Sequence, residues 1–164
     1  MIAQKIHCSL EIASAGILLH CMGMRIIELT RENIDQYLTG CLEVQQFLVK
    51  PGEQIDPEQF RTTAQGGDRY FVAVVEADCV VGLGVINKIV HPVRTNAYID
   101  NIVVHADFRG RGYFTAIMNE LETKAREWGA DGVKLTCSRP EVQPLYEKRG
   151  YAEKTSTKYY VKKL

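Results

Sequence analysis

The stretch DFRGRGYFTAIM, residues 107–118, lies between a run with the composition of a strand and a run with helical periodicity. In it Gly110 and Gly112 alternate with Arg109 and Arg111. The first amides of a helix have no intrahelical partner and carry partial positive charge. Glycines ahead of them let the main chain approach a ligand closely, because no Cβ stands in the way. A strand, a glycine-rich turn and a helix start therefore predict an anion site, and phosphate or diphosphate fits it best.

Two other phosphate-binding patterns fit this stretch less well. A P-loop requires GxxxxGK followed by Ser or Thr, which the sequence lacks. The dinucleotide pattern GxGxxG would need glycine at Thr115, and it would follow an early strand rather than a hairpin. A second GxG, Gly82-Leu83-Gly84, lies inside a strand run with no helix after it, so we expect a bulge or a close backbone approach there.

Hydrophobic periodicity on both sides of the loop predicts an α/β domain with a mixed sheet. Strands are expected over residues 25–29, 70–76, 79–90, 96–105 and 132–138, with a closing strand over 153–164. Helices are expected after an N-cap at Thr30, after an N-cap at Asp56 with Pro57 in the first turn, from about 114 to 128, and over 141–149. The helix between strands 96–105 and 132–138 is the crossover of a parallel pair.

Length and composition limit the class of protein. The chain has 164 residues, 46% apolar and 24% charged, with a formal net charge of zero. That length suits one domain, and the balanced charge argues against nucleic acid as a partner. The five cysteines lack the spacing of a zinc site, so no metal is expected, and a cytoplasmic location is the simplest expectation. Residues 1–23 are expected to be an N-terminal extension outside the fold, and residues 24–164 the domain, with no membrane-spanning segment from Met24 onward.

Two segments together carry a family resemblance. IDNIVVHADFRGRGYFTAIMNEL, residues 99–121, followed by PLYEKRGY, residues 144–151, resembles the GNAT superfamily of acetyl-CoA-dependent N-acetyltransferases. The family's phosphate loop is Arg/Gln-x-x-Gly-x-Gly/Ala, and residues 109–114 match it except at Phe114, where Gly or Ala is usual. The resemblance implies a mixed, mostly antiparallel central sheet with a parallel pair splayed at the cofactor site and helices on both faces.

The resemblance also implies a set of site residues. Acetyl-CoA would be the co-substrate, and an amine would attack its thioester directly. Tyr146 matches the family's general acid, and Asp100 is a candidate base acting through water. A main-chain N–H near Val103 or Val104 would stabilise the carbonyl oxygen. The residues expected to bind the cofactor are Ile102, Val103, Val104, Arg109, Gly110, Arg111, Gly112, Tyr113, Phe114 and Thr115.

The acceptor amine is less defined. We expect a primary amine of a small molecule, with an amino-sugar phosphate, a protein amine, or an acetyl-CoA sensor without turnover as alternatives. The acceptor would contact the two N-terminal helices and the loop over 51–56. His105 and Cys137 are weaker candidates for catalysis, and Tyr159 and Tyr160 suggest a possible homodimer edge.

Overall fold

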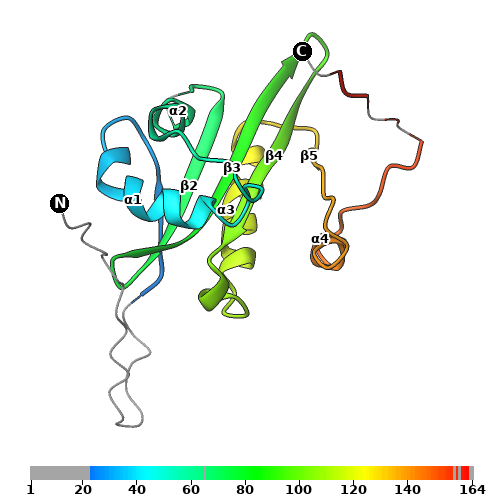
Figure 1. Cartoon of the computed structure of the whole chain (residues 1–164). Coiled ribbons are helices and arrows are strands. Elements are labelled where there is room, and N and C mark those ends of the chain that lie inside the picture. The colour runs from blue at the N-terminus through cyan, green and yellow to red at the C-terminus, as the bar shows by residue number, and fades with distance from the viewer. Residues whose placement is uncertain (1–22, 65, 157, 159, 163–164) are drawn as a thin grey trace, which may run out of the picture. The chain divides into compact units, whose positions relative to one another are not determined.

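The computed structural model describes residues 23–64, 66–156, 158 and 160–162. Residues 1–22, nearly all of the predicted extension, lie outside the described residues. Chain contacts define two compact units, one ending at Lys134 and one beginning at Leu135. A five-stranded sheet has its strands in sequence order: β1 Arg25–Glu28, β2 Arg69–Glu76, β3 Cys79–His91, β4 Arg94–Val104 and β5 Val133–Leu135 (Figure 1).

The sheet is mixed, as the sequence predicts. Antiparallel pairing joins β1 to β2, β2 to β3 and β3 to β4. Between β2 and β3 the turn residues Ala77 and Asp78 have φ of 46° and 63°, the left-handed values of a tight hairpin turn. The last pair, β4 and β5, is parallel.

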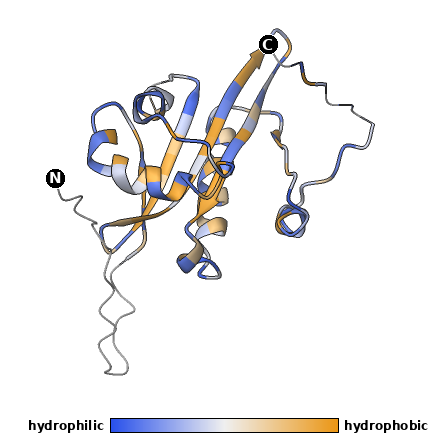
Figure 2. Ribbon diagram, in the orientation of Figure 1, coloured by the Kyte–Doolittle hydropathy of each residue, from blue (hydrophilic) through white to orange (hydrophobic). Residues whose placement is uncertain are grey.

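Helices cover both faces of the sheet (Figure 1). Helices α1 (Ile34–Gln45) and α2 (Pro57–Thr63) lie on one face, and α3 (Tyr113–Glu127) lies on the other. Hydrophobic residues are concentrated in the strands and on the helix sides that face them (Figure 2). The core under α1 and α2 consists of Leu29, Ile34, Leu38, Cys41, Val44, Phe60, Phe71, Ala73, Leu83, Val85 and Val103. A short helix, α4 (Gln143–Glu147), belongs to the second unit.

The GxG of β3 is a close-packing device, as expected. A Cβ on Gly84 would lie 2.3 Å from Cγ2 of Ile117, and a Cβ on Gly82 would lie 3.0 Å from Cδ1 of the same side chain. Ile117 is fully buried in α3. The two glycines therefore let α3 pack directly on the backbone of β3.

Both predicted caps make capping hydrogen bonds, although the regular part of α1 begins later than expected. Asp56 caps α2 by accepting a hydrogen bond of 2.9 Å from the backbone N–H of Glu58. Thr30 accepts in the same way from the N–H of Glu32, and its own N–H donates to Oδ1 of Asn33. Its carbonyl accepts from the N–H of Ile34 at 3.0 Å, so a turn over residues 31–33 leads from Thr30 into α1, whose regular part begins at Ile34.

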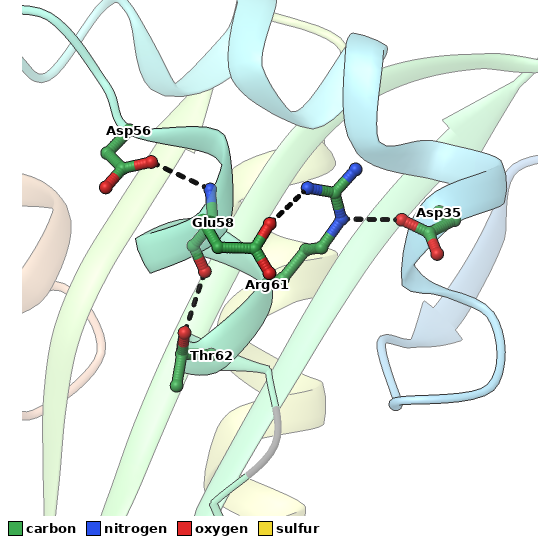
Figure 3. Close-up of polar contacts among 5 residues, drawn as sticks. All are labelled: Asp35, Asp56, Glu58, Arg61 and Thr62. Carbon is green, nitrogen blue, oxygen red and sulfur yellow. Dashed lines mark hydrogen bonds and ion pairs between the residues drawn. The ribbon is translucent and has the colours of Figure 1, made fainter.

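Arg61 joins α1 to α2 (Figure 3). Its Nε donates to Oδ1 of Asp35 on α1, and its Nη1 donates to Oε2 of Glu58 on α2, both at 2.7 Å. The guanidinium therefore fixes how the two helices of this face meet. These are the helices expected to contact the acceptor.

The predicted closing strand is wrong for the described part of residues 153–164, which contains no strand. Its described side chains are exposed, including Tyr160 at 82% and Val161 at 76%. A strand is held by a neighbouring strand and by a buried face, and neither is present for these residues. Tyr159 lies outside the described residues, so the dimer expectation remains a prediction.

Candidate active site

A β-bulge in β4 marks the start of the site. Ile99 pairs with Ile86 and Ile102 pairs with Gly84, so Asp100 and Asn101 together oppose Val85. Bulges insert one residue and turn the side chains beyond them to the other face. Asp100 is exposed at this bulge.

The strand pairing on either side of the bulge shows that the side chains of β4 switch faces of the sheet there. Val103 pairs with Leu83, and Ile99 pairs with Ile86. Because Leu83 and Ile86 are three residues apart, they lie on opposite faces of β3. Ile99 and Val103 therefore also lie on opposite faces, whereas residues four apart in a regular strand would share one.

Beyond the bulge, β4 extends past its outer neighbour. The N–H of Ala97 donates to the carbonyl of Gly132, and the N–H of Asp131 donates to that of Thr95, so the two segments meet near the beginning of β4. β5 has only 3 residues, whereas β4 has 11. Because all strands advance by about the same distance per residue, β5 ends near the level of the bulge in β4. No other described strand pairs with the outer edge of residues 102–104, which is the edge where an extended ligand could bind.

The loop after β4 has the geometry of an anion cradle. A 3₁₀ turn, Ala106–Phe108, leads into Gly110 and Gly112, whose φ values are +77° and +86°. A Cβ at either glycine would meet nothing within 4 Å, so the space beside the backbone is open. Gly112 is the N-cap of α3, and no side chain caps the helix. No side chain accepts a cap hydrogen bond at this helix start, and an anion beside the two glycines could take that place.

Both loop arginines are held at the rim by weak contacts. Nε of Arg109 donates to the carbonyl of Val104 at 3.3 Å, and its guanidinium lies 5.9 Å from the ring centroid of Phe47. Nη2 of Arg111 donates to the carbonyl of Asp107 at 3.4 Å, and its guanidinium lies 5.1 Å from the ring centroid of Phe108. Long hydrogen bonds of this kind can be exchanged for stronger, charge-assisted bonds to a phosphate.

An aromatic row lies under these arginines. Phe47, which follows α1, packs edge to face on His105 at 4.8 Å, and His105 packs on Phe108 at 5.6 Å. Phe108 in turn lies 6.4 Å from Tyr113. His105 also accepts a hydrogen bond from the N–H of Asp107, which gives it a structural place in the 3₁₀ turn. Phe47 could not be predicted to lie here, because it is about 60 residues away from the loop along the chain.

Tyr113, and not Phe114, is the first buried residue of α3. Tyr113 is 4% exposed, whereas Phe114 is only half-buried. The pKa of Tyr113 is raised, first by burial and then by the carboxylate of Glu76. Glu76 is the last residue of β2 and was not among the predicted site residues.

The second unit holds Tyr146 and Cys137. Tyr146 is half-buried on α4, with its ring centroid 5.9 Å from that of Tyr151. Its pKa is raised, mainly by burial and secondarily by the charge of Cys137. The phenol is therefore protonated throughout the neutral range, as a proton donor must be. The thiol of Cys137 donates to the carbonyl of Arg139 at 3.4 Å.

The loop residues 109–115, the β4 residues 102–104 and Asp100 all belong to the first unit, whereas Tyr146 belongs to the second. Within the described part of the chain, no three His, Cys, Asp or Glu side chains are grouped in a way that could hold a metal ion. Among those same residues, no helix is long and apolar enough to cross a membrane.

Comparisons with known proteins agree with this architecture. The model of the acetyltransferase (GNAT) family matches residues 32–151. No curated protein matches the sequence. Among solved structures, an aminoglycoside acetyltransferase from an uncultured soil metagenomic sample superposes with a TM-score of 0.69 at 16% identity, covering 85% of this chain and 97% of the other.

Two further structures show the same fold. A ribosomal-protein-alanine N-acetyltransferase from Brucella melitensis biovar Abortus 2308 has a TM-score of 0.68 at 20% identity, covering 87% of this chain and 100% of that one. Glucosamine-6-phosphate N-acetyltransferase from Arabidopsis thaliana has a TM-score of 0.68 at 21% identity, covering 85% and 98%. These likenesses extend over nearly the whole of the other chains, and the family model spans most of this one. The chain belongs to the acetyltransferase (GNAT) family.

Proposed function

We propose that this protein is an N-acetyltransferase that moves the acetyl group of acetyl-CoA to a primary amine of a small molecule by direct attack. The observation that carries the proposal is the start of α3, where two glycines with positive φ and an uncapped helix end face open space between two arginines. A diphosphate fits such a cradle because backbone amides and mobile cations can share its charge.

Acetyl-CoA supplies the activated thioester, and the residues of this chain supply binding and proton transfer. The amides of residues 112–115, with Arg109 and Arg111, hold the diphosphate. The main chain of residues 102–104 binds the extended arm along the open edge of β4. An N–H near Val103 or Val104 donates to the carbonyl oxygen as that oxygen gains charge.

Two proton transfers complete the reaction. Tyr146 donates its phenolic proton to the departing thiolate, a role supported by the family motif. Asp100, exposed at the bulge, accepts the proton of the attacking amine through water. The new bond joins the amine nitrogen to the acetyl carbon, the carbon–sulfur bond breaks, and the products are an amide and a free thiol.

A thiol-release assay with a panel of primary amines tests the proposal. The panel includes aminoglycosides, amino-sugar phosphates and a peptide with a free amino terminus, which separates the acceptor classes. Tyr146→Phe removes the proposed acid, and Tyr151→Phe is the matched control, because it removes the phenol of the neighbouring ring. We expect release with at least one amine, a fall of about 10²-fold or more in kcat for Tyr146→Phe, and little change for Tyr151→Phe. Binding of acetyl-CoA without release from any amine would identify a sensor instead.

A further inference from the structure

Glu76 contacts two residues that flank the central glycine of the loop. Its Oε2 lies 3.8 Å from Nη1 of Arg111, and its carboxylate interacts with the phenol of Tyr113, whose pKa is raised by burial and by this carboxylate. Arg111 and Tyr113 are the residues immediately before and after Gly112. Glu76 itself ends β2, next to the tight turn of the β2–β3 hairpin, so it is attached to the rigid sheet.

The loop needs such support because its own backbone provides little. Gly110 and Gly112 have open space beside them and lie in the left-handed region, where glycine has access to many other conformations. No side chain caps α3 to hold its first turn. A loop that must be ordered when a ligand binds loses affinity, whereas a loop already held in the bound conformation does not.

We propose that Glu76 is a positioning residue for the diphosphate site: by holding Arg111 and Tyr113 on either side of Gly112, it fixes the loop in the conformation that receives the ligand. The inference rests on the proposed function for the identity of that ligand. Glu76 does not itself touch the diphosphate, since its charge would repel it.

The two contacts differ in their exposure to solvent. Tyr113 is 4% exposed, so its interaction with the carboxylate is little screened by salt. The ion pair with Arg111 is partly exposed, with side-chain exposures of 54% and 30%, and is screened by salt. Phe108 also packs on Arg111 and on Tyr113, so the arginine keeps one support when Glu76 is changed.

A set of variants separates these contacts. Glu76→Ala removes both, Glu76→Gln keeps a neutral polar group beside Tyr113 but removes the ion pair, and Tyr113→Phe removes only the phenol. Asp78→Asn is the matched control. Asp78 lies in the same hairpin and forms an ion pair of 2.9 Å with Arg25, away from the loop. The substitution therefore also removes one negative charge and also breaks an ion pair with an arginine.

Two measurements read out the effect. The first is titration calorimetry with acetyl-CoA, together with KM and kcat once an amine is found. We expect Kd and KM for acetyl-CoA to rise about 5- to 20-fold in Glu76→Ala and about 2- to 5-fold in Glu76→Gln, with kcat within about twofold. Asp78→Asn should match the wild type. In an Arg111→Ala background, Glu76→Gln should have no further effect, because its partner is already gone.

The second measurement is amide hydrogen exchange of residues 110–115 in the ligand-free protein, with melting temperatures to establish that each variant is folded. We expect faster exchange of these amides in Glu76→Ala and unchanged exchange in Asp78→Asn. Unchanged exchange in Glu76→Ala, tighter binding in Glu76→Gln, or an equal effect with and without Arg111 would overturn the inference. If the wild type bound no acetyl-CoA, the proposed function would fail, while exchange would still decide the role of Glu76.

Discussion

Replacing Gly84 by alanine should destabilise the protein by about 2–3 kcal/mol, because it forces a methyl group between β3 and α3. The added Cβ would lie 2.3 Å from Cγ2 of Ile117, 3.2 Å from Cδ1 of Leu121 and 3.5 Å from a methyl of Val72. The first contact is far too short, and all three neighbours are fully buried and so have no empty space to move into. The helix must shift or the side chains must leave their preferred rotamers.

Two other glycines calibrate this magnitude. At Gly82 the Cβ would lie 3.0 Å from Cδ1 of Ile117 and 3.2 Å from the carbonyl oxygen of Val103, so a smaller adjustment suffices and we expect a cost of about 1–2 kcal/mol. At Gly132 a Cβ meets nothing within 4 Å, and no positive φ is required. Gly132→Ala should therefore range from no change to a stabilisation of about 1 kcal/mol, because alanine restricts the unfolded chain.

Urea unfolding gives the three free energies. The single tryptophan, Trp128, lies at the C-terminal end of α3, so its fluorescence reports on the helix that the substitution displaces. Coincident circular dichroism transitions would establish two-state unfolding. Combining Gly84→Ala with Ile117→Ala should give a coupling of at least about 1 kcal/mol, since the second change removes the colliding methyl. Equal stability of the Gly84→Ala and Gly132→Ala proteins would refute the close packing of α3 on β3.

Three further outcomes are expected. Gly112→Ala should weaken acetyl-CoA binding and cost about 1–2 kcal/mol of stability, because alanine disfavours a φ of +86°. Wild-type affinity measured by calorimetry would contradict the proposal that this loop binds the diphosphate. Tyr70→Phe should destabilise the protein by about 1–3 kcal/mol in urea unfolding, because it leaves Oε1 of Glu120 without the 2.6 Å hydrogen bond of that phenol. Burial raises the pKa of Cys41 from 9.0 to about 12, so the folded state holds this proton more tightly than the unfolded state. The contribution of Cys41 to stability is therefore complete below pH 9 and is lost progressively as pH rises towards 12. The difference in unfolding free energy between wild type and Cys41→Ala should shrink over that range. A constant difference would show that the thiol pKa is not raised by folding.

Local patterns in the sequence were sufficient for most of the elements. The β-branched runs that became β2 and β3 and the cap at Asp56 were correctly predicted, because each depends on neighbours within a few residues. The prediction for Gly82 and Gly84 also held, since two glycines in a buried strand have few other uses. A prediction failed where the signal needs a distant partner: the described part of residues 153–164 forms no strand.

The candidate site divides in the same way. The glycine-rich turn and the helix start after it could be predicted from residues 107–118 alone, because glycine dihedral angles and helix ends are properties of a short segment. At the bulge, Asp100 and Asn101 lie opposite the single residue Val85. This arrangement depends on the pairing register of two strands, so it cannot be predicted from the sequence of one strand. Glu76 and Phe47 meet the loop only because the sheet and α1 bring them there from far away in the chain. The sequence by itself therefore determined the backbone of the loop, because neighbouring residues set its glycine turns and the start of α3. Only the tertiary structure decided which side chains hold that loop in place, because contacts between distant segments depend on how the whole sheet packs.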